Sequence, residues 1–162
     1  MKHVILTISL LALISCKDSN NQNTKMETTE PSADIHNANH SEDASHVYAN
    51  AWMNEIELNN GRKWQANTET NEGIQKMKNS IKTQTINTLD DYYRLAEQLN
   101  NDKNYVVKNC TMKGASHDNL HVWLLPLMEK IEALSEVKTM ENASKLKRSI
   151  EENINAYSNY FK

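Results

Sequence analysis

The chain has 162 residues, with 18 Lys and Arg against 21 Asp and Glu, so its formal net charge is −3. This weakly acidic balance argues against a nucleic-acid-binding protein, because such proteins carry a basic surface. With only three glycines and two prolines, the composition excludes collagen-like and proline-rich classes and argues against a turn-rich all-β domain. Two cysteines, Cys16 and Cys110, are too few for a disulfide framework.

The first sixteen residues have the pattern of an export signal. A short basic start is followed by an almost entirely apolar run over residues 4–14. This run is too short to span a bilayer and has the length of a signal-peptide core. It ends in Leu13-Ile14-Ser15-Cys16, which resembles the lipobox of bacterial lipoproteins, where the signal is cleaved before a lipidated cysteine. An ordinary signal peptide followed by a coincidental cysteine is the alternative interpretation.

The lipobox resemblance implies a signal peptide over residues 1–15 and a mature chain that begins at Cys16. Acyl chains such as palmitate would then hold the protein to a membrane, since each buried methylene contributes about 0.8 kcal/mol and two or more chains anchor stably. Lys17 follows the cysteine where an inner-membrane retention signal of the enteric type has aspartate. We therefore expect a cell-envelope protein anchored at the outer membrane, in a leaflet that the sequence does not specify.

Residues 16–46 have the composition of a flexible tether. After Cys16 the segment contains no aromatic residue, and Met26 and Ile35 are its only large apolar residues. It therefore buries too little surface to offset the entropy lost on ordering. Its three histidines are His36, His40 and His46. They could bind metal ions weakly, but their spacing matches no defined metal motif, so solvated linker residues are the simpler interpretation.

The folded domain is expected over residues 47–162 and opens with a hairpin signal. Residues 53–58 partly alternate between polar and apolar types, and Asn60-Gly61 follows them. Asn-Gly between alternating segments is the strongest short-range signal for a β-hairpin. We expect a small N-terminal hairpin or extended lead-in that carries Trp52 and Trp64. It must pack on the helices that follow, because two strands alone are barely stable.

Two amphipathic helices are predicted next. Apolar residues recur at helical spacing after a capping Thr70 or Asn71, and again after Thr88. The second helix is expected to end at residues 100–102, where polar residues interrupt the pattern, and a short helix or turn follows over residues 105–110. The apolar faces comprise Ile74, Met77 and Ile81 in the first helix and Leu89, Tyr92, Tyr93, Ala96 and Leu99 in the second.

Two further helical patterns lie beyond Gly114. One begins at Ser116 and contains Pro126, which lacks a backbone donor and is expected to bend the helix. The other is capped by Thr139 and runs to Phe161. Four amphipathic stretches with short links predict an all-α domain, an antiparallel bundle similar to a four-helix bundle.

The candidate chemistry lies at the start of the third of these stretches. His117 and His121 are four residues apart, so on a helix they share one face and can bind a single metal ion. Cys110 and Met112 supply a soft thiolate and a soft thioether just before Gly114, which permits a sharp reversal toward the histidines. These four side chains are the predicted metal ligands.

Other residues could support this site, and each ligand has a simpler explanation. Met77 from an earlier helix is a further soft donor, and Asp118 could orient an imidazole. Sulfur together with imidazole favours copper, especially Cu(I), and zinc is also compatible. However, Cys110 and Met112 also pack like ordinary hydrophobic core residues. A histidine pair at this spacing is often simply exposed or hydrogen-bonded.

The sequence Cys-Thr-Met-x-Gly-x-x-His-x-x-Leu-His-x-x-Leu-x-Pro-Leu, from Cys110 to Leu127, resembles a known family. The family consists of small exported helical-bundle lipoproteins of Gram-negative bacteria, often encoded beside heavy-metal or copper-handling genes. The stretch from Lys63 to Met77 is similar to the upstream part of the same pattern. The resemblance covers about half of the chain. It implies a helical bundle and metal binding, and it transfers no catalytic residue.

Three functional hypotheses follow. The favoured one is a membrane-tethered cell-envelope protein that binds a transition metal ion, copper first, for buffering or delivery. The second is a haem-binding electron carrier, since Met and His ligate haem iron, although no Cys-x-x-Cys-His motif for covalent attachment occurs. The third is a structural or protein-interaction module without a metal. An enzyme is least supported, because no oxyanion motif accompanies Cys110 and the two histidines.

Overall fold

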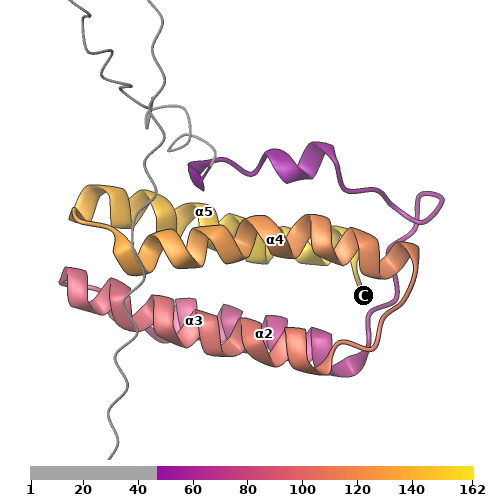
Figure 1. Ribbon diagram of the computed structural model, residues 1–162, viewed down its shortest axis with the longest axis horizontal. Helices are drawn as coiled ribbons and strands as arrows, with labels where there is room; N and C mark the ends of the chain where they lie inside the picture. Colours follow the sequence, from indigo (N-terminus) through magenta and orange to yellow (C-terminus); the bar gives the residue numbers. More distant parts are fainter. Residues whose placement is uncertain (1–46) are drawn as a thin grey trace, which may run out of the picture. The chain divides into compact units, whose positions relative to one another are not determined.

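Four long helices make up most of residues 47–162, the part of the protein that the computed structural model describes (Figure 1). The predicted signal peptide, the predicted lipidation site Cys16 and the three histidines of the predicted tether lie outside the described residues. A 3₁₀ turn, η1, spans Ala51–Asn54, and helices α2, α3, α4 and α5 span Thr68–Thr83, Leu89–Asn109, Ala115–Glu136 and Met140–Tyr160. The prediction of an all-α domain built as a four-helix bundle is confirmed.

Consecutive helices run antiparallel, because short links join them, and α2 also packs against α5 (Figure 1). In the view of Figure 1, α4 and α5 form one layer and α2 and α3 form the other. The link over residues 110–114 lies at the same end of the bundle as the start of α2 and the end of α5. We call this end, formed by residues 67–71, 109–121 and 157–162, the histidine end.

The apolar faces expected from helical spacing are buried between the helices. Ile74, Leu95 and Leu127 are almost completely inaccessible to solvent, and so is Trp123 of α4. The Trp123 indole N–H donates a hydrogen bond to the Asn153 carbonyl (2.9 Å), so its polar edge is satisfied inside the core. Within residues 47–162, none of the helices is both long and apolar enough to cross a lipid bilayer.

Local capping sets the start of α3 and α5, as predicted. The Thr88 hydroxyl accepts a hydrogen bond from the Asp91 N–H, and the Asp91 carboxylate accepts one from the Thr88 N–H, which forms a capping box. Hydrogen bonds from the Asn87 N–H and from Thr88 hold the pKa of Asp91 at about 2. Thr139 caps α5 by accepting from the Asn142 N–H (3.2 Å).

Two predicted helix boundaries are wrong. The second predicted helix does not end at residues 100–102, because α3 continues unbroken to Asn109. Asp102 is buried there and accepts hydrogen bonds from Ser80 of α2 (2.6 Å) and from Gln98 (3.1 Å), which satisfy a polar residue inside the bundle. Helix α2 begins at Thr68, before the predicted cap at Thr70 or Asn71.

The N-terminal lead-in contains a tight turn in place of a two-stranded hairpin. Asn60 and Gly61 both have positive φ, and Asn59 and Arg62 exchange two backbone hydrogen bonds (2.8 and 3.0 Å), as in an Asn-Gly hairpin turn. The extended segment after the turn pairs instead with the C-terminus. There the Trp64 N–H donates to the Tyr160 carbonyl (2.7 Å). The lead-in thus packs on the bundle, as expected.

Helices α2 and α3 are in tight contact at Gly73. This glycine is buried, and a Cβ placed on it would overlap Cγ2 of Val106 and would lie 3.3 Å from the ring of Tyr105. Val106 cannot move away easily, because its side chain is fully buried and its β-branch restricts χ1. A side chain at residue 73 would therefore push the two helices apart.

We predict that Gly73→Ala destabilises the domain. The overlap should cost about 1–3 kcal/mol, and the better helix propensity of alanine should return about 1 kcal/mol of that cost. Urea unfolding at pH 7 measures the difference. Asn79→Ala, an exposed change on the same helix, serves as the control and should stay within about 0.5 kcal/mol of the parent. If the overlap is the cause, Gly73→Ala should cost less in a Val106→Ala background.

Candidate functional site

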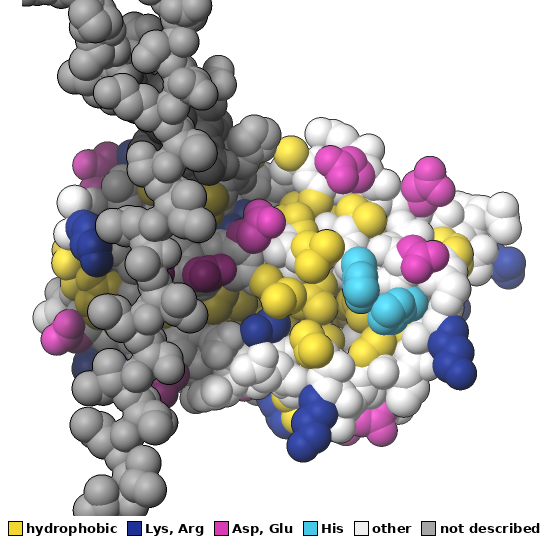
Figure 2. Space-filling view, viewed as in Figure 1, with side chains coloured by type: hydrophobic (Ala, Val, Ile, Leu, Met, Phe, Trp, Pro, Cys, Tyr) yellow, Lys and Arg dark blue, Asp and Glu magenta, His cyan; other side chains and the backbone are white. Residues whose placement is uncertain are grey.

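The two histidines of the motif lie side by side in the first two turns of α4. Their ring centroids are 4.3 Å apart. His117 is half-buried and His121 is exposed, and Figure 2 shows histidine side chains together on the surface beside hydrophobic ones. The prediction that they share one helix face is confirmed.

Gly114 positions this pair by starting α4. Its backbone has φ 60° and ψ −148°, a conformation that is essentially restricted to glycine. Its carbonyl accepts the first hydrogen bonds of the helix, from the His117 N–H (2.8 Å) and the Asp118 N–H (3.0 Å). The chain therefore reverses at Gly114 and brings His117 into the first turn, as the sequence predicted.

The two predicted sulfur ligands lie on the link before Gly114 and face the core. Cys110 and Met112 are both half-buried and pack against the hydrophobic core. Tyr157 of α5 belongs to that core. Burial raises the pKa of Tyr157 above its ordinary value, and a charge on Cys110 raises that pKa further.

Asn67, which the sequence analysis did not single out as functional, organises the link. Its side-chain oxygen accepts hydrogen bonds from the Thr70 hydroxyl (2.6 Å) and from the Thr111 N–H (3.4 Å). Its amide N–H₂ donates to the Asn109 carbonyl (3.0 Å). One side chain therefore connects the start of α2 with the chain leaving α3. One feature of the sequence could have pointed to Asn67. It lies in the stretch from Lys63 to Met77, which is similar to the upstream part of the exported-lipoprotein pattern.

The structure brings together only part of the predicted ligand set. Within residues 47–162, no three side chains drawn from His, Cys, Asp and Glu are placed to hold one metal ion. Cys110 therefore does not join His117 and His121 in a preformed site. Met77 is fully buried in the core on α2. The preformed element is the histidine pair, with Cys110 and Met112 on the adjoining link.

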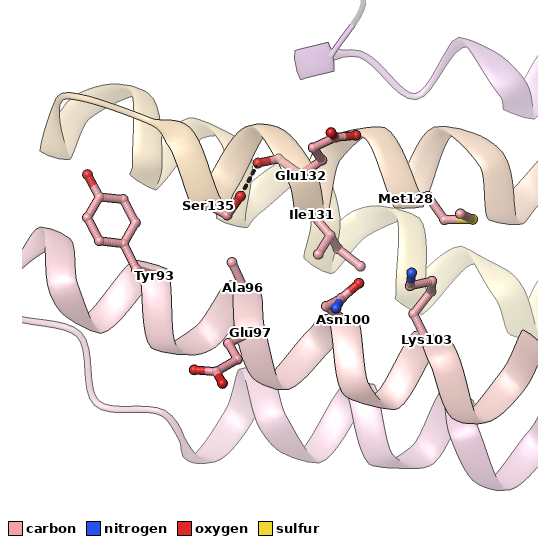
Figure 3. A pocket seen from close by; sticks show the side chains of 9 residues that line it. All are labelled: Tyr93, Ala96, Glu97, Asn100, Lys103, Met128, Ile131, Glu132 and Ser135. Atoms are coloured by element: carbon pink, nitrogen blue, oxygen red, sulfur yellow. Dashed lines mark hydrogen bonds between the residues drawn. The ribbon is translucent and has the colours of Figure 1, made fainter. Parts of the chain in front are cut away.

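A hollow of about 350 Å³ lies between α3 and α4 (Figure 3). Its lining combines apolar side chains with Glu97, Glu132 and Lys103. Met128 also lines it, but no histidine or cysteine does. The hollow therefore does not supply the Met–His pair that the haem hypothesis requires.

A buried lysine is the most unusual charged group of the described domain, and sequence analysis missed it. Lys130 of α4 is only 1% exposed, and its ammonium donates hydrogen bonds to the side-chain oxygens of Asn50 and of Asn153 (3.0 Å to Asn153). Asn50 also accepts from the Trp52 indole (3.0 Å). Lys130 therefore connects the lead-in to the centre of the bundle.

Burial sets the charge behaviour of Lys130. It lowers the pKa of this ammonium to about 8, although the charges of Glu129 and Glu152 act in the opposite direction. A lysine in the unfolded chain has a pKa of about 10.4. Between these two pH values the unfolded chain binds more protons than the folded protein, so the free energy of unfolding rises with pH.

Comparison of the chain with protein-family models, with curated proteins and with solved structures found no match. The resemblance of the Cys110–Leu127 stretch to exported lipoproteins therefore stays a prediction. A functional proposal rests on the geometry of the histidine end.

We predict that Lys130→Met changes the pH dependence of stability. Relative to the variant, the parent protein should become more stable between about pH 8 and about pH 10.4, because Lys130 is neutralised earlier in the folded state. Urea unfolding at a series of pH values measures this difference. Lys138→Met, at an exposed position of the link between α4 and α5, controls for the loss of one positive charge. Parallel pH profiles for the parent and Lys130→Met would contradict this assignment.

Proposed function

We propose that the protein binds a transition metal ion at the histidine end of its bundle, with His117 and His121 as the primary ligands. The observation that carries this proposal is the 4.3 Å separation of their rings on one helix face. From that separation, side-chain rotation brings one nitrogen of each ring to the metal–nitrogen distance of about 2.0–2.1 Å. The helix backbone, with its start fixed at Gly114, supports both side chains.

The neighbouring sulfur donors support copper as the preferred metal. Imidazole suits zinc and copper alike, whereas thiol and thioether ligands favour Cu(I). Cys110 and Met112 are close in sequence to the pair but pack against the core, so they would join the metal only after the 110–114 link shifts. In this proposal, metal binding provides the free energy for that shift.

The proposed setting is the cell envelope of a Gram-negative bacterium. The lipobox-like sequence ending at Cys16 supports a lipid anchor, with outer-membrane attachment expected from Lys17. A metal-binding domain on such an anchor would buffer metal ions near the membrane or deliver them to another protein.

We predict that the full chain carrying Cys16→Ser binds Cu(I) and that the histidine pair is required. In competition with a chromophoric Cu(I) chelator under reducing conditions, His117→Ala/His121→Ala should weaken binding by roughly 100-fold or more. Loss of a partner that only supports a metal ligand already costs about 10–100-fold. Because His121 is exposed and His117 half-buried, the double variant should keep its fold, which circular dichroism checks.

Two matched variants locate the binding. The first variant removes the three histidines of the predicted tether, by His36→Asn, His40→Asn and His46→Asn, and its affinity for the first Cu(I) ion should be unchanged. Cys110→Ser should weaken Cu(I) binding less than the histidine substitutions do. Equal affinity of the parent and the His117→Ala/His121→Ala variant would disprove the proposal.

A further inference from the structure

The histidine pair is an incomplete ligand set. Zn²⁺ in proteins takes four ligands, and His117 and His121 supply two. Within the described domain, no third His, Cys, Asp or Glu side chain is placed to complete a site with them. As residues 47–162 are folded, they leave the remaining coordination positions of a Zn²⁺ ion on this pair open, and a second molecule could fill them.

Two exposed apolar side chains lie on the helices that form this part of the surface, Leu125 on α4 and Val107 on α3. Leu125 lies one helical turn beyond His121 and is 52% exposed. Residues 117, 121 and 125 are spaced by four, so they lie along one side of α4. Val107 is 55% exposed and lies one turn beyond Lys103, which lines the hollow between α3 and α4. Leu125 therefore lies on the same side of α4 as the histidines, and Val107 lies on the side of α3 that faces α4.

This surface has the composition of a contact with another protein. Covering exposed large apolar side chains removes their surface from water, which lowers the free energy. Figure 2 shows a hydrophobic patch directly beside histidine side chains. A second copy of the same chain would bring two further imidazoles along with its own Leu125 and Val107. Such a pairing completes the four ligands and covers both apolar side chains at once.

We propose that two copies of this chain share one Zn²⁺ ion, held by His117 and His121 of each copy. A two-fold arrangement uses the same patch on both copies, which is the commonest form of protein dimer. The four imidazoles meet around the ion on the symmetry axis, and Leu125 and Val107 pack around them. This inference rests on the proposed function, because it uses the same histidine pair.

Native mass spectrometry of the full chain tests the shared ion. The protein carries Cys16→Ser and the three tether substitutions His36→Asn, His40→Asn and His46→Asn, with a thiol-free reductant present to prevent disulfides. With chelator we expect a single chain, and with Zn²⁺ alone we expect a species of two chains and one Zn²⁺. A half-equivalent of Zn²⁺ per chain should saturate this species.

Two variants separate the dimer from the binding of metal. His117→Ala/His121→Ala should abolish both Zn²⁺ binding and the dimer. Leu125→Arg leaves both imidazoles in place, adds no metal ligand beside them, and should give a monomer that still binds Zn²⁺. Monomers that bind one Zn²⁺ per chain in the parent protein would overturn the shared ion but leave the proposed function standing. A dimer that forms equally without Zn²⁺ would also overturn it, and absence of binding to both Zn²⁺ and Cu(I) would overturn both proposals.

Discussion

The close contact between Gly73 of α2 and Val106 of α3 limits how far apart these two helices can lie, and the histidine end is built where α2 begins and α3 ends. A Cβ at residue 73 would overlap the Val106 side chain, so the backbone of α2 packs directly on that side chain. Asn67 then reaches from the start of α2 to Asn109 and Thr111, which holds the chain as it leaves α3. The reversal that follows starts α4 at a fixed place, and the histidine pair comes from its first turns.

The same end of the bundle holds its potential ligands in two different ways. The histidines lie on a helix, where backbone hydrogen bonds hold their spacing, and their rings are at the surface. Cys110 and Met112 lie on a link, with their side chains against the core. The imidazoles are therefore already adjacent in the fold, as the proposed metal site requires, whereas Cys110 and Met112 are half-buried against the core. This division favours an imidazole site that a soft metal ion could extend by drawing in the link.

Sequence patterns correctly predicted the features that depend on residues close together in the chain. Thr88 and Thr139 mark helix starts because a cap acts over three residues, and the histidine pair could be placed from its spacing of four. The rest depends on partners distant in sequence. The polar residues at 100–102 suggested a helix end, yet Asp102 is satisfied by Ser80 of another helix. Lysine is usually a surface residue, so nothing in the sequence indicated that Lys130 lies in the core. Only the fold brings its partners Asn50 and Asn153 to it.

Nitrogen-15 NMR of the histidine side chains tests the central claim most directly. In the full chain carrying Cys16→Ser, addition of Zn²⁺ should move the ring-nitrogen resonances of His117 and His121 together to the shifts of metal-bound imidazole, before those of His36, His40 and His46 change. If the resonances of His117 and His121 stay at their metal-free positions while the tether histidines respond, the bundle does not contain the metal site that its helix geometry indicates.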